Sequence, residues 1–210
     1  MRPKIIIFGD SITEGSFGDG GWGAALAHHF SRSLDVVLRG YSGYNTRWVL
    51  KVIEKICSSG DDAPIAMTVF FGANDASLPD RTSAFQHVPL HEYKQNLHAI
   101  VSFIKKKWPT TLVLLITPPP IDEDGRLRHP FGENPSGLPE RTNEAAGAYA
   151  KACIAVADEC GVLVVDLWTK MQQFPNWEKS CLRLGFDFQF LQVIAFSMAD
   201  DLPSMISRRK

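Results

Sequence analysis

Apolar residues along the chain fall into two kinds of segment. Five short runs are almost wholly apolar and rich in Val, Ile, Leu and Phe, which is typical of strands covered on both faces. They span residues 4–8, 35–38, 65–71, 112–116 and 162–166. Between them, apolar residues recur every three or four positions, as on the buried face of an amphipathic helix. These helical segments cover residues 22–30, 48–56, 93–108 and 146–157.

The alternation of strand and helix predicts an α/β fold. Repeated β-α units with short connections form a parallel sheet whose two faces are covered by helices. We therefore expect a flavodoxin-like, doubly wound, five-stranded parallel sheet in a three-layer α/β/α arrangement.

Two segments interrupt this pattern. The first begins at Thr117-Pro118-Pro119-Pro120 and is rich in Pro, Gly and Asp as far as Pro139. We expect a long surface loop there, and such loops in compact domains are usually functional or mobile. The second is the tail from Leu184 to Lys210, where a last helix is expected but residues 184–190 alternate between apolar and polar. The sequence thus predicts a domain over residues 1–183 and a divergent tail over 184–210.

Composition and charge exclude several classes of partner. The chain has 210 residues, 45% of them apolar and 21% charged, and its net charge is −1, which suits one soluble domain. Its longest like-charge run, Lys105-Lys106-Lys107, ends a helical pattern, where cations are favoured. We therefore expect neither nucleic-acid binding nor a membrane span. Four cysteines without C-x-x-C spacing predict reduced thiols in a cytoplasmic protein, and the pattern makes no prediction of oligomeric state.

Small polar motifs follow the first three predicted strands. Gly9-Asp10-Ser11 ends the first, Gly43 follows the second and Asn74 follows the third. Neighbouring parallel strands bring their carboxyl ends to one edge of the sheet, where open α/β folds place their sites. A hydroxyl, an unobstructed backbone N–H and an amide donor would then converge. That is the composition of a nucleophile facing an oxyanion hole.

With these motifs the chain resembles the SGNH, or GDSL-type, hydrolases, in particular the isoamyl acetate-hydrolysing esterase branch with its plant GDSL esterase/lipases. Three of the family's four blocks are present. They are Gly-Asp-Ser at residues 9–11, a glycine after the second strand at Gly43 (with Gly40 as the alternative register), and Gly-x-Asn-Asp at residues 72–75.

The resemblance implies hydrolysis of small carboxylic esters through an acyl-serine intermediate, without a metal or organic cofactor. Ser11 would be the nucleophile. The N–H groups of Ser11 and Gly43 and the side-chain amide of Asn74 would stabilise the oxyanion. Asp10 would support the nucleophile turn.

The fourth block, an Asp-x-x-His that supplies the base, has no counterpart. Where the branch reads Ser/Arg-Asp-Gly-Leu-His-Leu-Thr, this chain reads Leu182-Arg183-Leu184-Gly185-Phe186-Asp187, and no histidine follows His129. A serine hydroxyl is a poor nucleophile without an adjacent base, and removing that base typically lowers turnover about 10⁶-fold. We therefore expect impaired turnover; the alternative is an inactive, truncated isoform that binds a ligand or partner. The loop histidines His87 and His129 are alternatives for a substitute base.

Other interpretations compete for several of these residues. Ser11 could instead cap a helix, since serine often does so at such a turn. We interpret Asp75 as a structural turn carboxylate and Asp166 as a strand-end carboxylate. The stretch from Gly18 to Gly23 formally matches G-x-G-x-x-G, but it begins ten residues after the first strand and no acidic residue ends the second. A dinucleotide cofactor is therefore not expected.

Overall fold

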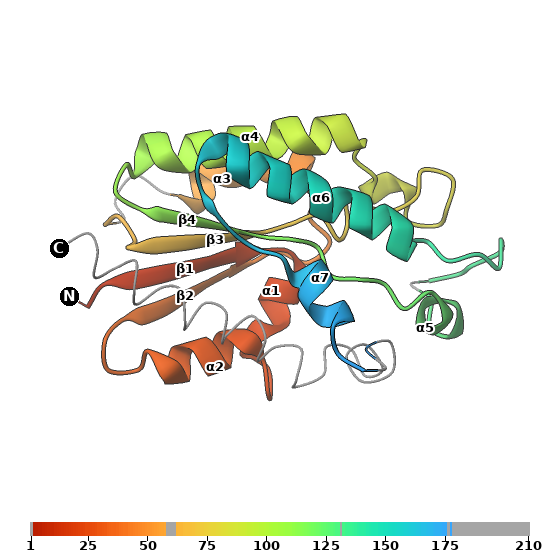
Figure 1. Ribbon diagram of the computed structural model, residues 1–210, viewed down its shortest axis with the longest axis horizontal. Coiled ribbons are helices and arrows are strands. Elements are labelled where there is room, and N and C mark those ends of the chain that lie inside the picture. Colours follow the sequence, from red (N-terminus) through yellow and green to blue (C-terminus); the bar gives the residue numbers. More distant parts are fainter. Residues whose placement is uncertain (1, 58–61, 131, 176, 178–210) are drawn as a thin grey trace.

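The computed structural model describes residues 2–57, 62–130, 132–175 and 177. Its centre is a five-stranded, wholly parallel sheet in the order β2-β1-β3-β4-β5 (Figure 1). All five strands lie where the apolar runs predict them. They are β1 (Lys4–Gly9), β2 (Asp35–Gly40), β3 (Ala66–Phe70), β4 (Leu112–Ile116) and β5 (Leu163–Val165).

Helices cover both faces of the sheet, so the predicted three-layer α/β/α fold is confirmed. On one face lie α3 (Thr46–Ile56), α4 (Leu90–Lys107) and α6 (Asn143–Cys160), and on the other lie α1 (Ser11–Glu14), α2 (Trp22–His29) and α7 (Leu167–Gln172) (Figure 1). Side chains of β1 alternate between the two layers. Ile6 and Phe8 pack against α3 and α4, whereas Ile5 and Ile7 pack against α2.

The strand order creates a switch point beside β1. The chain leaves β1 for β2 on one side, and β3 then pairs with the other side of β1. Loops that leave adjacent strands in opposite directions open a crevice at the carboxyl edge of the sheet. The three polar motifs of the sequence all lie at this edge.

Polar residues define where several helices begin. The Asn45 side chain accepts a hydrogen bond from the Trp48 N–H at 2.9 Å and so caps α3. Asp166 caps α7 by accepting from the Thr169 N–H at 3.1 Å, in agreement with its interpretation as a structural carboxylate. Gly161, with a φ of +57°, ends α6.

The prediction of a long surface loop from Thr117 is wrong in two respects. The segment from Thr117 to Ile121 is buried rather than at the surface: the Thr117 hydroxyl accepts from the Trp168 N–H of α7 at 3.0 Å, and the Ile121 N–H donates to Asn143 of α6 at 3.2 Å. The rest of the predicted loop contains a short helix, α5 (Glu123–Arg128). Cys153 is buried within α6, whereas Cys160 is partly exposed at its end.

The predicted boundary at residues 183 and 184 and the divergent tail lie outside the described residues. Within the described part of the chain, no helix combines the length and apolar character that crossing a bilayer requires.

Candidate active site

A tight turn joins β1 to α1 and carries Ser11. Gly9 ends the strand, and a Cβ there would collide with the Thr13 side chain, so only glycine fits. The Asp10 side chain accepts a hydrogen bond from the Ile12 N–H at 2.9 Å and caps α1. Asp10 therefore fills the capping role considered for Ser11, and Ser11 is left exposed at the start of the helix.

Two carboxyl groups are buried at this turn: Asp10 of the turn itself and Asp75, which follows β3. Burial raises the pKa of Asp10 and of Asp75 to about 7 each; at Asp10 the neighbouring Asp75 raises the pKa further, while Arg141 lowers it. Asp75 accepts from the Thr46 N–H at 3.0 Å and from the Thr46 hydroxyl at 2.5 Å, which fixes the start of α3. Asp75 is thus a structural carboxylate, as interpreted from the sequence.

The loop after β2 distinguishes the two candidate glycines. A Cβ on Gly40 would collide with the backbone of Glu14 in α1, so Gly40 is required for packing. Gly43 has a φ of +77°, in the region that glycine favours, and its carbonyl accepts from the Gln86 side chain at 3.0 Å. This packing role for Gly40 favours Gly43 as the oxyanion donor.

Asn74 follows β3 and reaches across to the Gly43 loop. Its side-chain NH₂ donates to the Tyr44 carbonyl at 2.8 Å, and its Oδ1 accepts from Arg141 at 3.2 Å. The residue is only 7% exposed. One amide hydrogen is used by Tyr44, and within the described residues the second has no acceptor.

Three hydrogen-bond donors are therefore uncommitted at one edge of the sheet. Within the described residues, neither the Ser11 N–H nor the Gly43 N–H donates a hydrogen bond, and Asn74 retains one amide hydrogen. Their loops are tied together, because the Tyr41 N–H donates to the Gly9 carbonyl at 2.9 Å. Donors of this kind can stabilise negative charge on the oxygen of a tetrahedral intermediate.

The model of the GDSL-like lipase/acylhydrolase family matches residues 7–185 of the chain. The chain belongs to this family. The predicted family, and with it the class of carboxylic ester hydrolases, is confirmed.

Several relatives of the chain carry esterase names. The chain is 68% identical over 186 residues to a GDSL esterase/lipase of Arabidopsis thaliana, covering 87% of this chain and 77% of that protein. It is 44% identical over 175 residues to the human isoamyl acetate-hydrolyzing esterase 1 homolog, covering 82% and 69%.

Solved structures share the fold. A lipase/acylhydrolase from Enterococcus faecalis matches with a TM-score of 0.71 and 24% identity, over 95% of this chain and 96% of that one. The acetylxylan esterase Axe2 from Geobacillus stearothermophilus matches with a TM-score of 0.70 and 21% identity, over 94% and 93%. The predicted GDSL fold is thereby confirmed.

The structure adds two residues that the sequence did not indicate. Arg141, in the loop before α6, donates to the side-chain oxygens of Asn74 and Gln86. Gln86 in turn donates to Gly43. No local pattern marks these residues, because the partners of Arg141 lie 67 and 55 positions away in the sequence.

Neither candidate substitute base is hydrogen-bonded to Ser11. The Nδ1 of His87 lies 2.6 Å from the Ser77 carbonyl and donates to it, while His129 is exposed at the end of α5. No hydrogen bond between described residues joins Ser11 to a histidine. Among the residues that the structure describes, no group of three or more His, Cys, Asp or Glu side chains could hold a metal ion.

Proposed function

We propose that this GDSL-family chain hydrolyses small carboxylic esters through an acyl-Ser11 intermediate. The observation that carries the proposal is the set of three uncommitted donors beside the exposed Ser11. A short acyl group is favoured by similarity to proteins named for isoamyl acetate hydrolysis. Cys153 and Cys160 form no disulfide among the described residues, and such reduced thiols favour a reducing compartment such as the cytoplasm.

The proposed reaction begins when the Ser11 Oγ attacks the ester carbonyl carbon and its proton passes to solvent. The carbonyl oxygen becomes an oxyanion that accepts hydrogen bonds from the N–H groups of Ser11 and Gly43 and from the Asn74 amide. Asp10 holds the turn through the Ile12 N–H. The intermediate collapses as its bond to the alkoxy group breaks, and the alkoxide takes a proton from solvent and leaves as the alcohol. Water then adds to acyl-Ser11, which releases the free acid and restores the Ser11 hydroxyl.

We further propose that turnover is impaired. The sequence carries no Asp-x-x-His, and among the described residues no histidine is hydrogen-bonded to Ser11 to take its proton. Oxyanion donors and substrate binding alone can retain roughly 10³–10⁴-fold acceleration over water. The second candidate function, a non-catalytic binding module, rests on the same missing block.

Hydrolysis of p-nitrophenyl acetate tests the proposal and separates the two candidates. The purified chain is compared with Ser11→Ala and with Ser102→Ala, which makes the same change at an exposed serine of α4. We expect slow hydrolysis that Ser11→Ala abolishes and Ser102→Ala preserves. Equal rates for all three proteins would refute the acyl-Ser11 route, and saturable ester binding without Ser11-dependent turnover would favour the binding module.

A further inference from the structure

Arg141 is a buried cation with an unusually complete set of partners. It is only 6% exposed. Its guanidinium donates to the Ala73 carbonyl at 2.8 Å, to Glu140 at 2.9 Å, to Asn74 Oδ1 at 3.2 Å and to Gln86 Oε1 at 2.7 Å. Two of these acceptors belong to side chains that themselves contact the candidate oxyanion hole.

We propose that Arg141 is a positioning residue that orients the oxyanion donors of Asn74 and Gly43 together. It holds Asn74 directly. It holds the Gly43 loop through Gln86, whose Nε2 donates to the Gly43 carbonyl at 3.0 Å. This inference rests on the proposed function, because it concerns the same oxyanion hole.

The donor-only chemistry of arginine explains how this orientation is selected. A guanidinium has five N–H donors and no acceptor, so the side chain facing it must present an oxygen. Rotation of the Asn74 amide by half a turn would place its NH₂ against the cation. Arg141 therefore keeps the Asn74 NH₂ pointed toward Tyr44 and the open edge of the sheet.

The same constraint acts on Gln86. With its oxygen fixed by Arg141, its NH₂ must face the Gly43 carbonyl. A hydrogen bond to that carbonyl holds the peptide plane that follows Gly43. The preceding plane carries the Gly43 N–H and shares the Gly43 Cα, where φ is +77°, so its orientation is restrained through that atom. One cation thus connects a side-chain donor and a backbone donor that come from different loops.

Arg141 remains charged at neutral pH, as this role requires. Burial, together with the nearby Arg126, lowers its pKa to about 10, while Glu140 opposes that shift. Glu140 is itself buried and also accepts from Arg126 of α5 at 3.3 Å. Arg126 shares this carboxylate but contacts neither Asn74 nor Gln86, which makes it a matched control.

A reversible boronate adduct measures the oxyanion hole without relying on a catalytic base. Phenylboronic acid reacts with a serine hydroxyl: an O–B bond forms, boron becomes tetrahedral and negatively charged, and the serine proton passes to hydroxide in alkaline buffer. Adduct affinity is measured by ¹¹B NMR for the native chain, Arg141→Met, Arg141→Lys, Arg126→Met and Ser11→Ala. Near-ultraviolet circular dichroism checks that each variant is folded.

We expect Arg141→Met to weaken the adduct by about tenfold or more, since a single oxyanion donor contributes about 10²–10³ in rate. Arg141→Lys should recover part of the affinity, because an ammonium keeps the charge but lacks the planar fork that reaches both oxygens. Arg126→Met should bind as the native chain does. If Arg141→Met fails to fold, Gln86→Leu cuts the Gly43 branch alone and should also weaken the adduct.

The role of Arg141 and the proposed function are overturned by different results. Native affinity in folded Arg141→Met, even with a lowered unfolding temperature, would show a purely structural residue and overturn the inference alone. If Arg141→Met does not fold, native affinity in Gln86→Leu would overturn the inference about Arg141 instead. Absence of any Ser11-dependent adduct in the native chain would overturn the proposed function and this inference with it.

Discussion

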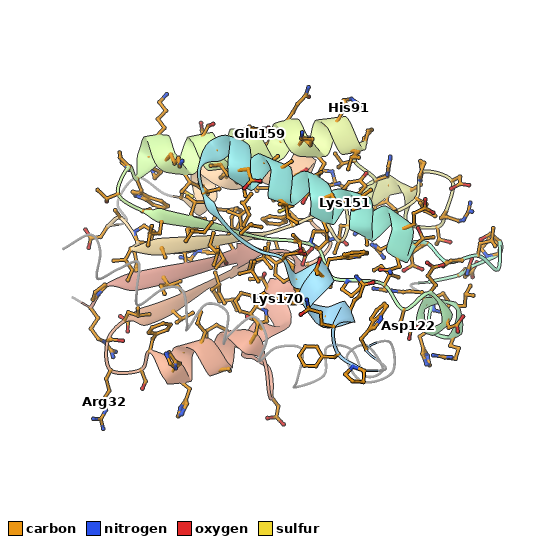
Figure 2. All side chains as sticks on the ribbon, viewed as in Figure 1. Arg32, His91, Asp122, Lys151, Glu159 and Lys170 are labelled. Carbon is orange, nitrogen blue, oxygen red and sulfur yellow. The ribbon has the colours of Figure 1, made fainter. Side chains whose placement is uncertain are left out.

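Ser11 and Cys160 are nucleophilic side chains at opposite edges of the sheet, and each has neighbours that the other lacks. The Cys160 Sγ lies 3.1 Å from His98 Nδ1, and His98 Nε2 lies 2.6 Å from Glu159. A nucleophile, a base and an orienting carboxylate are thus in order, on the far end of α6 where Figure 2 labels Glu159. Ser11 has three uncommitted donors at its edge of the sheet, but in the described part of the chain no histidine is hydrogen-bonded to it.

The difference shows why a triad of residue types does not make a hydrolytic site. Cys160 is the last residue of α6, and a helix C-terminus presents carbonyl oxygens and negative potential. Burial raises the pKa of its thiol, so the thiolate is disfavoured. Ser11 lies instead at the carboxyl edge of the sheet, beside N–H groups. We therefore place the proposed active site where developing negative charge can be stabilised, rather than where a histidine is close to a nucleophile.

The largest expected effect comes from adding an Asp-x-x-His segment to supply a base for Ser11. Replacing the tail from residue 184 with a segment bearing Asp-x-x-His should raise p-nitrophenyl acetate hydrolysis by about 10³-fold or more. The control is the same segment with alanine in place of its histidine. If both segments gave equal rates, the absence of Asp-x-x-His would not explain the low turnover that we propose.

Removing an oxyanion donor should have the next largest effect. Asn74→Ala should lower kcat by about 10²–10³-fold with little change in KM, because the donor acts on charge that develops in the transition state. Asn134→Ala, which makes the same change at a partly exposed asparagine of the loop before α6, serves as the matched control. Steady-state kinetics on the chain with the added histidine segment would measure this loss; an unchanged kcat would remove Asn74 from the oxyanion hole.

The sequence predicts some elements and some residues of the candidate site better than others. The strands are predictable because each is a continuous apolar run, and α3, α4 and α6 because their apolar faces are long. Helices as short as α1 and α5 show no repeated apolar spacing, and the prolines after β4 resemble a surface loop because their burial depends on residues distant in the sequence. The common location of Ser11, Gly43 and Asn74 at one edge of the sheet is predictable from strand ends alone, whereas the contacts of Arg141 join residues far apart in the sequence.

A smaller effect is expected at the buried Asp75, on the free energy of unfolding rather than on the rate of hydrolysis. The pKa of Asp75 is raised to about 7, so the folded chain keeps its proton while the unfolded chain loses it above about pH 4. The stability contributed by Asp75 is therefore full below about pH 4 and falls as pH rises to 7, by up to about 1.4 kcal/mol per pH unit.

Asp75→Asn should flatten the dependence of the unfolding free energy on pH in that window. Urea unfolding at several pH values would measure the slope, with the exposed Asp158→Asn as the control. Identical slopes for native chain and Asp75→Asn would mean that this carboxyl is ionised when folded.

The smallest effect is expected at Cys160. His98→Ala should change the rate of Cys160 alkylation by iodoacetamide only a few-fold, because burial already keeps the thiol protonated. Mass spectrometry of the labelled peptides includes the buried Cys57 and Cys153 as slower internal references. Rapid labelling that depends on His98 would contradict the contrast drawn with Ser11.

Acyl transfer to Ser11 is the most direct test of the central claim. The chain is incubated with p-nitrophenyl acetate, quenched in acid at successive times, digested and mapped by mass spectrometry, alongside Ser11→Ala. We predict an acetyl group on the peptide that contains Ser11, absent from the variant, and formed at the rate at which p-nitrophenol is released. Acetylation confined to other residues, or p-nitrophenol release unchanged by Ser11→Ala, would contradict the account.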